Sequence, residues 1–132
     1  MIMERAIEIF AIIQFVVIGL SHIVQHRAWA EFFIRLRGLG LPGAFMNGFL
    51  GLSFGSIVVA FHNVWSGPAM VLTIFGWLLL LKASISFVAP AVSMRAFERI
   101  SLERSWVFIP PGVIFLLMAG VLGFVPLSVA WK

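Results

Sequence analysis

Four stretches of about 20 predominantly apolar residues dominate this sequence, and each is long enough to cross a membrane as a helix. They cover residues 6–25, 43–61, 68–89 and 107–130. The chain has 132 residues, of which 62% are hydrophobic and only 11% are charged. A soluble domain of this length cannot bury so much apolar surface, whereas lipid solvates the outside of membrane helices. The sequence therefore predicts an all-α integral membrane protein, a four-helix bundle that forms a single transmembrane domain over residues 1–132.

The basic residues indicate how the bundle is oriented. Two of the connections between spans are rich in arginine: Arg27, Arg35 and Arg37 follow the first span, and Arg95, Arg99 and Arg104 follow the third. The opposite side carries only Arg5, Lys132 and an uncharged turn. By the positive-inside rule, both arginine-rich connections lie in the cytoplasm of a bacterial inner membrane and both termini lie outside. The net charge of +4 then reflects orientation and anionic lipid head groups, and predicts no nucleic-acid partner.

Both cytoplasmic connections have the pattern of amphipathic helices that lie in the membrane interface. In the first, predicted over residues 28–37, the apolar side chains recur at i, i+3, i+4 and i+7: Trp29, Phe32, Phe33 and Leu36. The second, predicted over residues 93–105, repeats the pattern less regularly with Met94, Phe97 and Ile100 on one side.

Small residues in the second span predict close helix packing. Gly51 and Gly55 form a GxxxG motif, and Gly48 lies one turn before it. Glycines allow two helix backbones to approach closely. The motif fits packing inside one bundle, and it equally fits a contact between copies of the chain. A bundle this small, rich in small residues and in aromatic residues within the spans, also predicts a homo-oligomer.

Residues 19–59 carry a resemblance to a known family. The first span ends near GLSHIVQ, an aromatic-rich amphipathic segment follows, and RGLGLPG leads into the glycine-rich second span GAFMNGFLGLSFG. This order resembles DoxX-type small bacterial membrane proteins. The resemblance implies a four-helix inner-membrane protein and an accessory role, because some members are membrane subunits of quinone-linked or sulfur-compound oxidoreductases. It assigns no catalytic residue to this chain.

Lys82 places a formal positive charge inside the third span, in the stretch GWLLLLKASISF. It lies eight residues before Pro90, and therefore about 12 Å from that end of a straight helix. This is further than a lysine stem extends toward the interface. An unpaired charge at such depth costs about 2.5–3.5 kcal/mol on insertion scales. We therefore expect Lys82 to have an interior polar partner, to meet water, or to be uncharged.

Polar residues of the neighbouring spans lie at depths close to that of Lys82, apart from Glu8, which lies nearer the outer end and too far away to pair with it directly. Together these residues form a predicted polar seam through the bundle: Glu8, Gln14, His22, Asn47 and Lys82. Such a seam conducts protons or an ion, or it binds the polar head of a quinone or lipid. The alternative is that Lys82 bonds backbone carbonyls or a single Asn and only fixes helix packing.

The outward turn HNVWSGP holds the other candidate residues, His62, Asn63 and Trp65. They either bind a ligand outside the membrane or cap the second span, with Trp65 in the aromatic belt of the interface. A haem between two histidines of one chain is not expected, because His62 lies near the outer end and His22 near the cytoplasmic end. No metal site is predicted.

The sequence contains few of the residues and motifs that are typical of enzymes. The chain contains no Cys, Asp or Tyr, and none of the common catalytic or nucleotide-binding motifs. No catalytic residue and no particular cofactor is predicted. The sequence favours a small oligomeric inner-membrane protein that forms a pore, a carrier or a lipid- or quinone-binding site around Lys82. The alternatives are an accessory membrane subunit of a quinone-linked redox complex and, least favoured, a self-contained membrane enzyme.

Overall fold

The computed structural model describes residues 2–130, and the side chains of residues 2–124. This part of the chain contains helices and no strand. The elements are α1 (Ile2–Val24), α2 (His26–Gly38), α3 (Leu41–Phe61), α4 (Met70–Val88), α5 (Pro90–Phe97), the 3₁₀ helix η1 (Ser105–Phe108) and α6 (Ile109–Ala130).

Four of these segments are long and apolar enough to cross a membrane: α1, α3, α4 and the segment Ser105–Phe124, which joins η1 to most of α6. The predicted all-α fold with four candidate membrane spans is therefore confirmed. Helix α1 begins at Ile2, four residues before the predicted start of the first span at residue 6.

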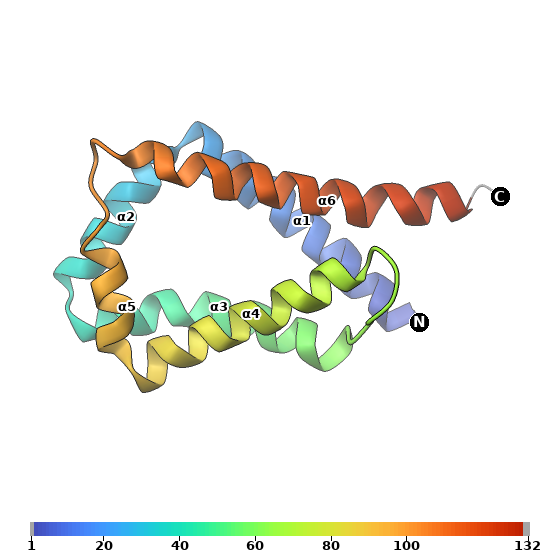
Figure 1. Ribbon diagram of the computed structural model, residues 1–132, viewed down its shortest axis with the longest axis horizontal. Coiled ribbons are helices and arrows are strands. Elements are labelled where there is room, and N and C mark those ends of the chain that lie inside the picture. Colours follow the sequence, from blue (N-terminus) through green and yellow to red (C-terminus); the bar gives the residue numbers. More distant parts are fainter. Residues whose placement is uncertain (1, 131–132) are drawn as a thin grey trace.

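The four spans associate as two pairs. Helix α1 packs along α6 and α3 packs along α4, whereas contacts between the two pairs are fewer. Figure 1 shows the pairs diverging from the end that carries the N-terminus toward the end that carries α2 and α5. The molecule thus has a closed end, where the pairs meet, and an open end, which the two short helices bridge.

Glycines set the close approach within each pair. A Cβ atom on Gly55 of α3 would lie 2.9 Å from the backbone nitrogen of Leu80 on α4. In the other pair, a Cβ on Gly112 of α6 would lie 2.7 Å from the carbonyl oxygen of Gly19 on α1. Cβ atoms on Gly48 and Gly51 would likewise meet side chains of α4. The glycine motif of the second span therefore packs inside one chain, as one of the two sequence interpretations has it.

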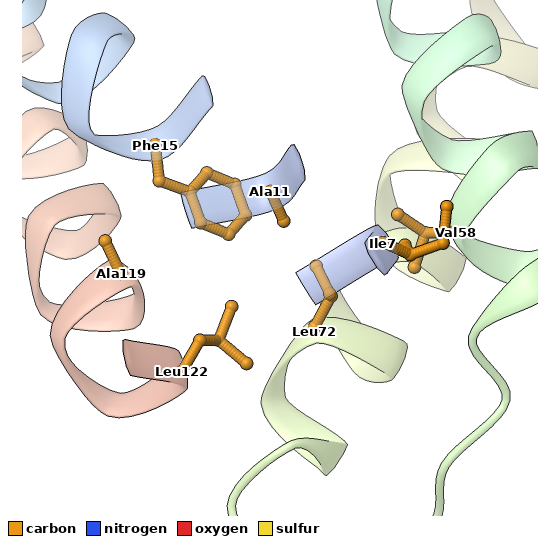
Figure 2. Packing of buried hydrophobic residues seen from close by; sticks show 7 residues of the cluster. All are labelled: Ile7, Ala11, Phe15, Val58, Leu72, Ala119 and Leu122. Carbon is orange, nitrogen blue, oxygen red and sulfur yellow. The ribbon is translucent and has the colours of Figure 1, made fainter. Parts of the chain in front are cut away.

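Apolar side chains from all four spans meet at the closed end. This closed-end core is formed by Ile7, Ala11, Phe15, Val58, Leu72, Ala119 and Leu122, and Figure 2 shows these side chains gathered from the four helices. The two helix pairs are thus held together at one end of the bundle by packing rather than along their whole length.

The first predicted surface helix is present as α2, which runs from His26 to Gly38 at the open end. Both ends of α2 contact the rest of the protein. Near its end, the Leu36 side chain is buried, and at its start the His26 ring nitrogen Nδ1 lies 2.8 Å from the Ser105 hydroxyl oxygen of η1.

The second surface helix differs from the prediction. A helix over residues 93–105 is wrong, because α5 covers Pro90–Phe97 and the chain leaves the helix there. The guanidinium Nη1 of Arg37 donates to the carbonyl oxygens of Phe97 and Ile100, each at 3.1 Å. These bonds from α2 hold the segment that follows α5, where the chain turns toward η1.

Candidate functional site

A cavity of about 340 Å³ lies between the two helix pairs. We call it the central cavity. Its walls come from five helices and are largely apolar, and they include eight Phe and Trp residues: Phe10, Phe15, Trp29, Phe32, Phe33, Phe54, Phe75 and Phe115. The cavity exists because the pairs diverge from the closed end, while α2 supplies part of its wall at the open end.

The ring of Phe15 organises the aromatic wall next to the closed end. Its centroid lies 5.1 Å from Phe75 in an edge-on contact and 5.7 Å from Phe115 in a stacked one. A tilted contact at 5.7 Å joins it to Phe54. These rings come from α1, α3, α4 and α6, and Phe15 also belongs to the closed-end core. The cavity is therefore bounded toward that end by tightly packed apolar groups.

Four of the five predicted seam residues line the central cavity: Gln14, His22, Asn47 and Lys82. Within the described residues, the side chains of Gln14, Asn47 and Lys82 have no hydrogen-bond or ion-pair partner. Hydrogen-bonding groups in an apolar cavity without protein partners are available to a ligand or to water.

Lys82 lies at the border of two cavities. A second cavity of about 440 Å³ is lined by α4, α5 and neighbouring residues, and it shares Phe33, Asn47 and Lys82 with the central cavity. Lys82 is exposed in the isolated chain. It precedes the end of α4 at Val88 by six residues, or about 9 Å of helix. Its ammonium group is thus placed within the span but beside open space on both sides.

His22 presents a hydrogen-bond acceptor. Its Nδ1 donates to the Ile18 carbonyl oxygen at 2.8 Å, because a carbonyl can only accept. In the neutral ring Nε2 therefore carries the lone pair, and it has no partner among the described residues. The ring stacks on Trp29 with a centroid distance of 4.2 Å, and the Trp29 indole N–H donates to the Ser21 hydroxyl oxygen at 2.9 Å. These contacts hold the imidazole in one orientation.

Glu8, the fifth predicted seam residue, does not line the cavity. It is buried at the closed end, where its Oε2 accepts a hydrogen bond of 2.9 Å from Arg5 Nη1. Arg5 Nη1 also donates to the Leu122 carbonyl oxygen of α6 at 3.2 Å. A continuous seam from Glu8 to Lys82 is therefore not formed, because Glu8 bonds to Arg5 and lies outside the cavity lining.

His62 is the partner of Glu8 that the sequence interpretation missed. The atoms His62 Nε2 and Glu8 Oε1 are 2.9 Å apart, and His62 Nδ1 lies 3.1 Å from the Thr73 hydroxyl oxygen. His62 is completely buried, so it does not face the outer medium as the outer-turn interpretation required. The sequence contained a usable signal, because the predicted topology already placed Glu8 and His62 at the same outer end.

Asn63 and Trp65 remain exposed at the turn. The Asn63 side-chain oxygen accepts hydrogen bonds from two indole groups, Trp65 at 3.0 Å and Trp77 at 3.4 Å. Its Nδ2 donates to the Val59 carbonyl oxygen at 3.4 Å, near the end of α3. Through these contacts Asn63 orders the turn and fixes the positions of two tryptophan side chains.

The described residues bring no three His, Asp or Glu side chains together as a metal site. No family model, curated protein or solved structure matches this chain significantly. The resemblance to DoxX-type proteins therefore stays an expectation from the sequence. What the protein does has to be inferred from its cavities and the groups that line them.

Proposed function

We propose that this membrane protein binds an amphipathic membrane molecule, a lipid or a quinone, in the central cavity. The observation that carries the proposal is the set of four nitrogen-bearing polar side chains in a largely apolar cavity: Gln14, His22, Asn47 and Lys82. Three of them lack any partner in the described chain, and the fourth offers a free ring nitrogen. An apolar pocket with a few convergent polar groups is the usual form of a small-molecule site.

The volume supports a binding site. At about 340 Å³, the cavity falls within the ~300–1,000 Å³ common for ligand pockets. A pore through a single chain is less well supported, because the closed-end core fills the space between the four spans with apolar side chains. A cavity that is open at one end and closed at the other suits a molecule that enters and is held.

The chemistry of the lining suits an oxygen-rich head group with an apolar body. Lys82 and the amide nitrogens of Gln14 and Asn47 are donors, whereas His22 Nε2 is an acceptor. Quinone carbonyls and lipid phosphate or ester oxygens accept such bonds, and a quinol hydroxyl could donate to His22. The aromatic walls would contact the apolar part of either molecule.

We further propose that the protein lies in a bacterial inner membrane with α2 and α5 on the cytoplasmic side. The arginine-rich segments after the first and third spans form this end of the molecule. They favour the cytoplasmic side by the positive-inside rule. Assembly into a homo-oligomer remains part of the same proposal, supported by the many exposed apolar side chains on the spans.

A cavity-filling substitution tests the binding site. Ser53 lines the cavity, is exposed and makes no side-chain hydrogen bond to any described residue. Ser53→Phe should therefore fill the space with little disturbance to packing. After purification in a mild detergent, extraction and mass spectrometry should find about one lipid or quinone per wild-type chain and a clear loss in the variant.

The matched control is Ser56→Phe, the same change one turn away on α3 at an exposed position outside both cavities. This variant should retain the bound molecule as the wild type does. Equal retention by the Ser53→Phe protein, or an empty wild-type protein, would contradict the proposed function.

A further inference from the structure

The two cavities that meet at Lys82 are both largely apolar. On one side, the central cavity has the aromatic walls already described. On the other, the second cavity is lined by aliphatic residues of α4 and α5, among them Leu78, Leu81 and Val92. A ligand whose head lies at Lys82 therefore finds apolar space in two directions.

Both cavities adjoin surfaces that face acyl chains in a membrane. Leu50, in the lining of the central cavity, is 74% exposed, and Leu81, in the lining of the second cavity, is 60% exposed. Helices α2 and α5 contribute residues to the cavity walls near the end of the bundle. A lipid of the leaflet next to these helices can thus approach Lys82 from the side without crossing the closed end.

The positive charge of Lys82 has no negative charge to balance it in the described lining of the two cavities. Among the residues whose side chains the structure describes, Lys82 is the only formally charged one in the lining of either cavity, and neither lining includes a glutamate. Glu8, which the sequence already places too far from Lys82 to pair with it directly, is bonded to Arg5 and His62. A cation without a counter-charge in a low-dielectric space is costly, and an anionic group on a ligand would remove that cost.

We infer that the bound molecule is an anionic phospholipid with two acyl chains, and this inference rests on the proposed function. Its phosphate lies on the Lys82 ammonium, one chain occupies the central cavity and the other occupies the second cavity. Asn47, which also lines both cavities, donates to a further head-group oxygen. The positive charge of Lys82 favours an anionic head group, and the presence of two apolar cavities favours a lipid with two acyl chains.

The test is lipid competition followed by native mass spectrometry. Delipidated protein is incubated with equal amounts of phosphatidylglycerol and phosphatidylcholine of the same chain length, and the lipids retained per chain are counted. Wild-type protein should keep one phosphatidylglycerol with a preference of about tenfold or more over phosphatidylcholine. Lys82→Met should abolish the preference, whereas Lys82→Arg, which keeps the charge, should retain it.

Two controls separate this site from general attraction to the basic surface. Arg99→Gln removes a positive charge at an exposed position outside both cavities and should leave the preference unchanged. Single-chain lysophosphatidylglycerol should be retained at least several-fold less than the two-chain lipid, because it fills only one cavity.

The failures of the two proposals are distinguishable. If wild type and Lys82→Met retain both lipids equally, or if the Arg99→Gln variant loses the preference, the anionic head-group inference is wrong while the binding cavity stands. Equal retention of the single-chain lipid rejects the two-chain arrangement. If neither lipid nor any quinone is retained above the level of Ser53→Phe, the proposed function itself is overturned.

Discussion

At the scale of single residues, Lys82 combines a formal charge with the absence of any protein partner in the described chain. The sequence predicted a costly charge and expected an interior partner, water or a neutral amine. The structure places the side chain beside two cavities instead of against a polar group. No contact within the described part of the chain offsets the cost of placing this charge in a membrane span, and ionisable residues within spans commonly mark functional sites.

Replacing Lys82 by Met should leave the delipidated protein equally stable or more stable, by up to about 2.5 kcal/mol. The physical reason is that methionine fills similar apolar space without a charge that lacks a counter-charge. Thermal unfolding in detergent without added lipid measures this difference. Marked destabilisation of the Lys82→Met protein would show that the ammonium is bonded within the fold, contrary to the present account.

At the scale of structural elements, the buried network at the closed end joins α1 to the other spans. Glu8 on α1 bonds to His62 at the end of α3, and His62 bonds to Thr73 on α4. Arg5 adds the bond to α6 through Leu122. Because few contacts connect the two helix pairs, these bonds and the closed-end core determine how the pairs are held.

We expect Glu8→Gln and His62→Gln each to lower the free energy of unfolding by about 1–3 kcal/mol, since each leaves a buried partner poorly satisfied. The double variant should lose much less than the sum, because both changes break the same bond. The free energies from chemical unfolding of the wild type, the two single variants and the double variant form a double-mutant cycle, which gives the interaction energy between Glu8 and His62. Glu31→Gln, an exposed acid on α2, should change stability by less than about 0.5 kcal/mol. Strictly additive effects would argue against the Glu8–His62 bond.

Two glycines of α6 offer a matched test of helix packing. A Cβ atom on Gly112 would lie 2.7 Å from the Gly19 carbonyl oxygen, whereas one on Gly120 would meet nothing within 4 Å. Gly112→Ala should therefore destabilise the bundle by about 1–3 kcal/mol through overpacking. Gly120→Ala should be neutral or stabilising by up to about 1 kcal/mol, because alanine favours the helix. Similar melting temperatures for the two variants would contradict the close α1–α6 contact.

At the scale of the whole molecule, composition and apolar periodicity were enough to predict the four spans and the first surface helix. Depth along the spans also brought Gln14, His22, Asn47 and Lys82 to one region, where the structure finds a common cavity. Those predictions succeed because each depends on local pattern and on the fixed rise of a helix.

The remaining features depend on contacts between distant parts of the chain. Where helix α5 ends, the carbonyl oxygen of Phe97 accepts a hydrogen bond from Arg37, 60 residues earlier in the chain. The Gly19–Gly112 contact and the Glu8–His62 bond join residues on different helices. Depth alone cannot say which side of a helix faces which neighbour, so these pairings could not be read from the sequence.

The orientation of the molecule is open to a direct test, because the sequence lacks cysteine. A cysteine can therefore be introduced at one chosen position on each side. Ser66→Cys lies in the exposed turn before α4, and Ala28→Cys lies at an exposed position of α2. In intact bacterial cells, a membrane-impermeant maleimide should label the first variant, and should label the second only after permeabilisation. The reverse pattern would place the arginine-rich end outside.

The central claim is that the space beside Lys82 holds a membrane molecule by its polar head. An experimental density map of the wild-type protein in lipid nanodiscs tests it most directly. The account predicts an elongated density in the central cavity, with a head group within hydrogen-bond distance of the Lys82 ammonium. Helix pairs closed against each other with no such density, or a Lys82 side chain extended to the head-group layer, would contradict it.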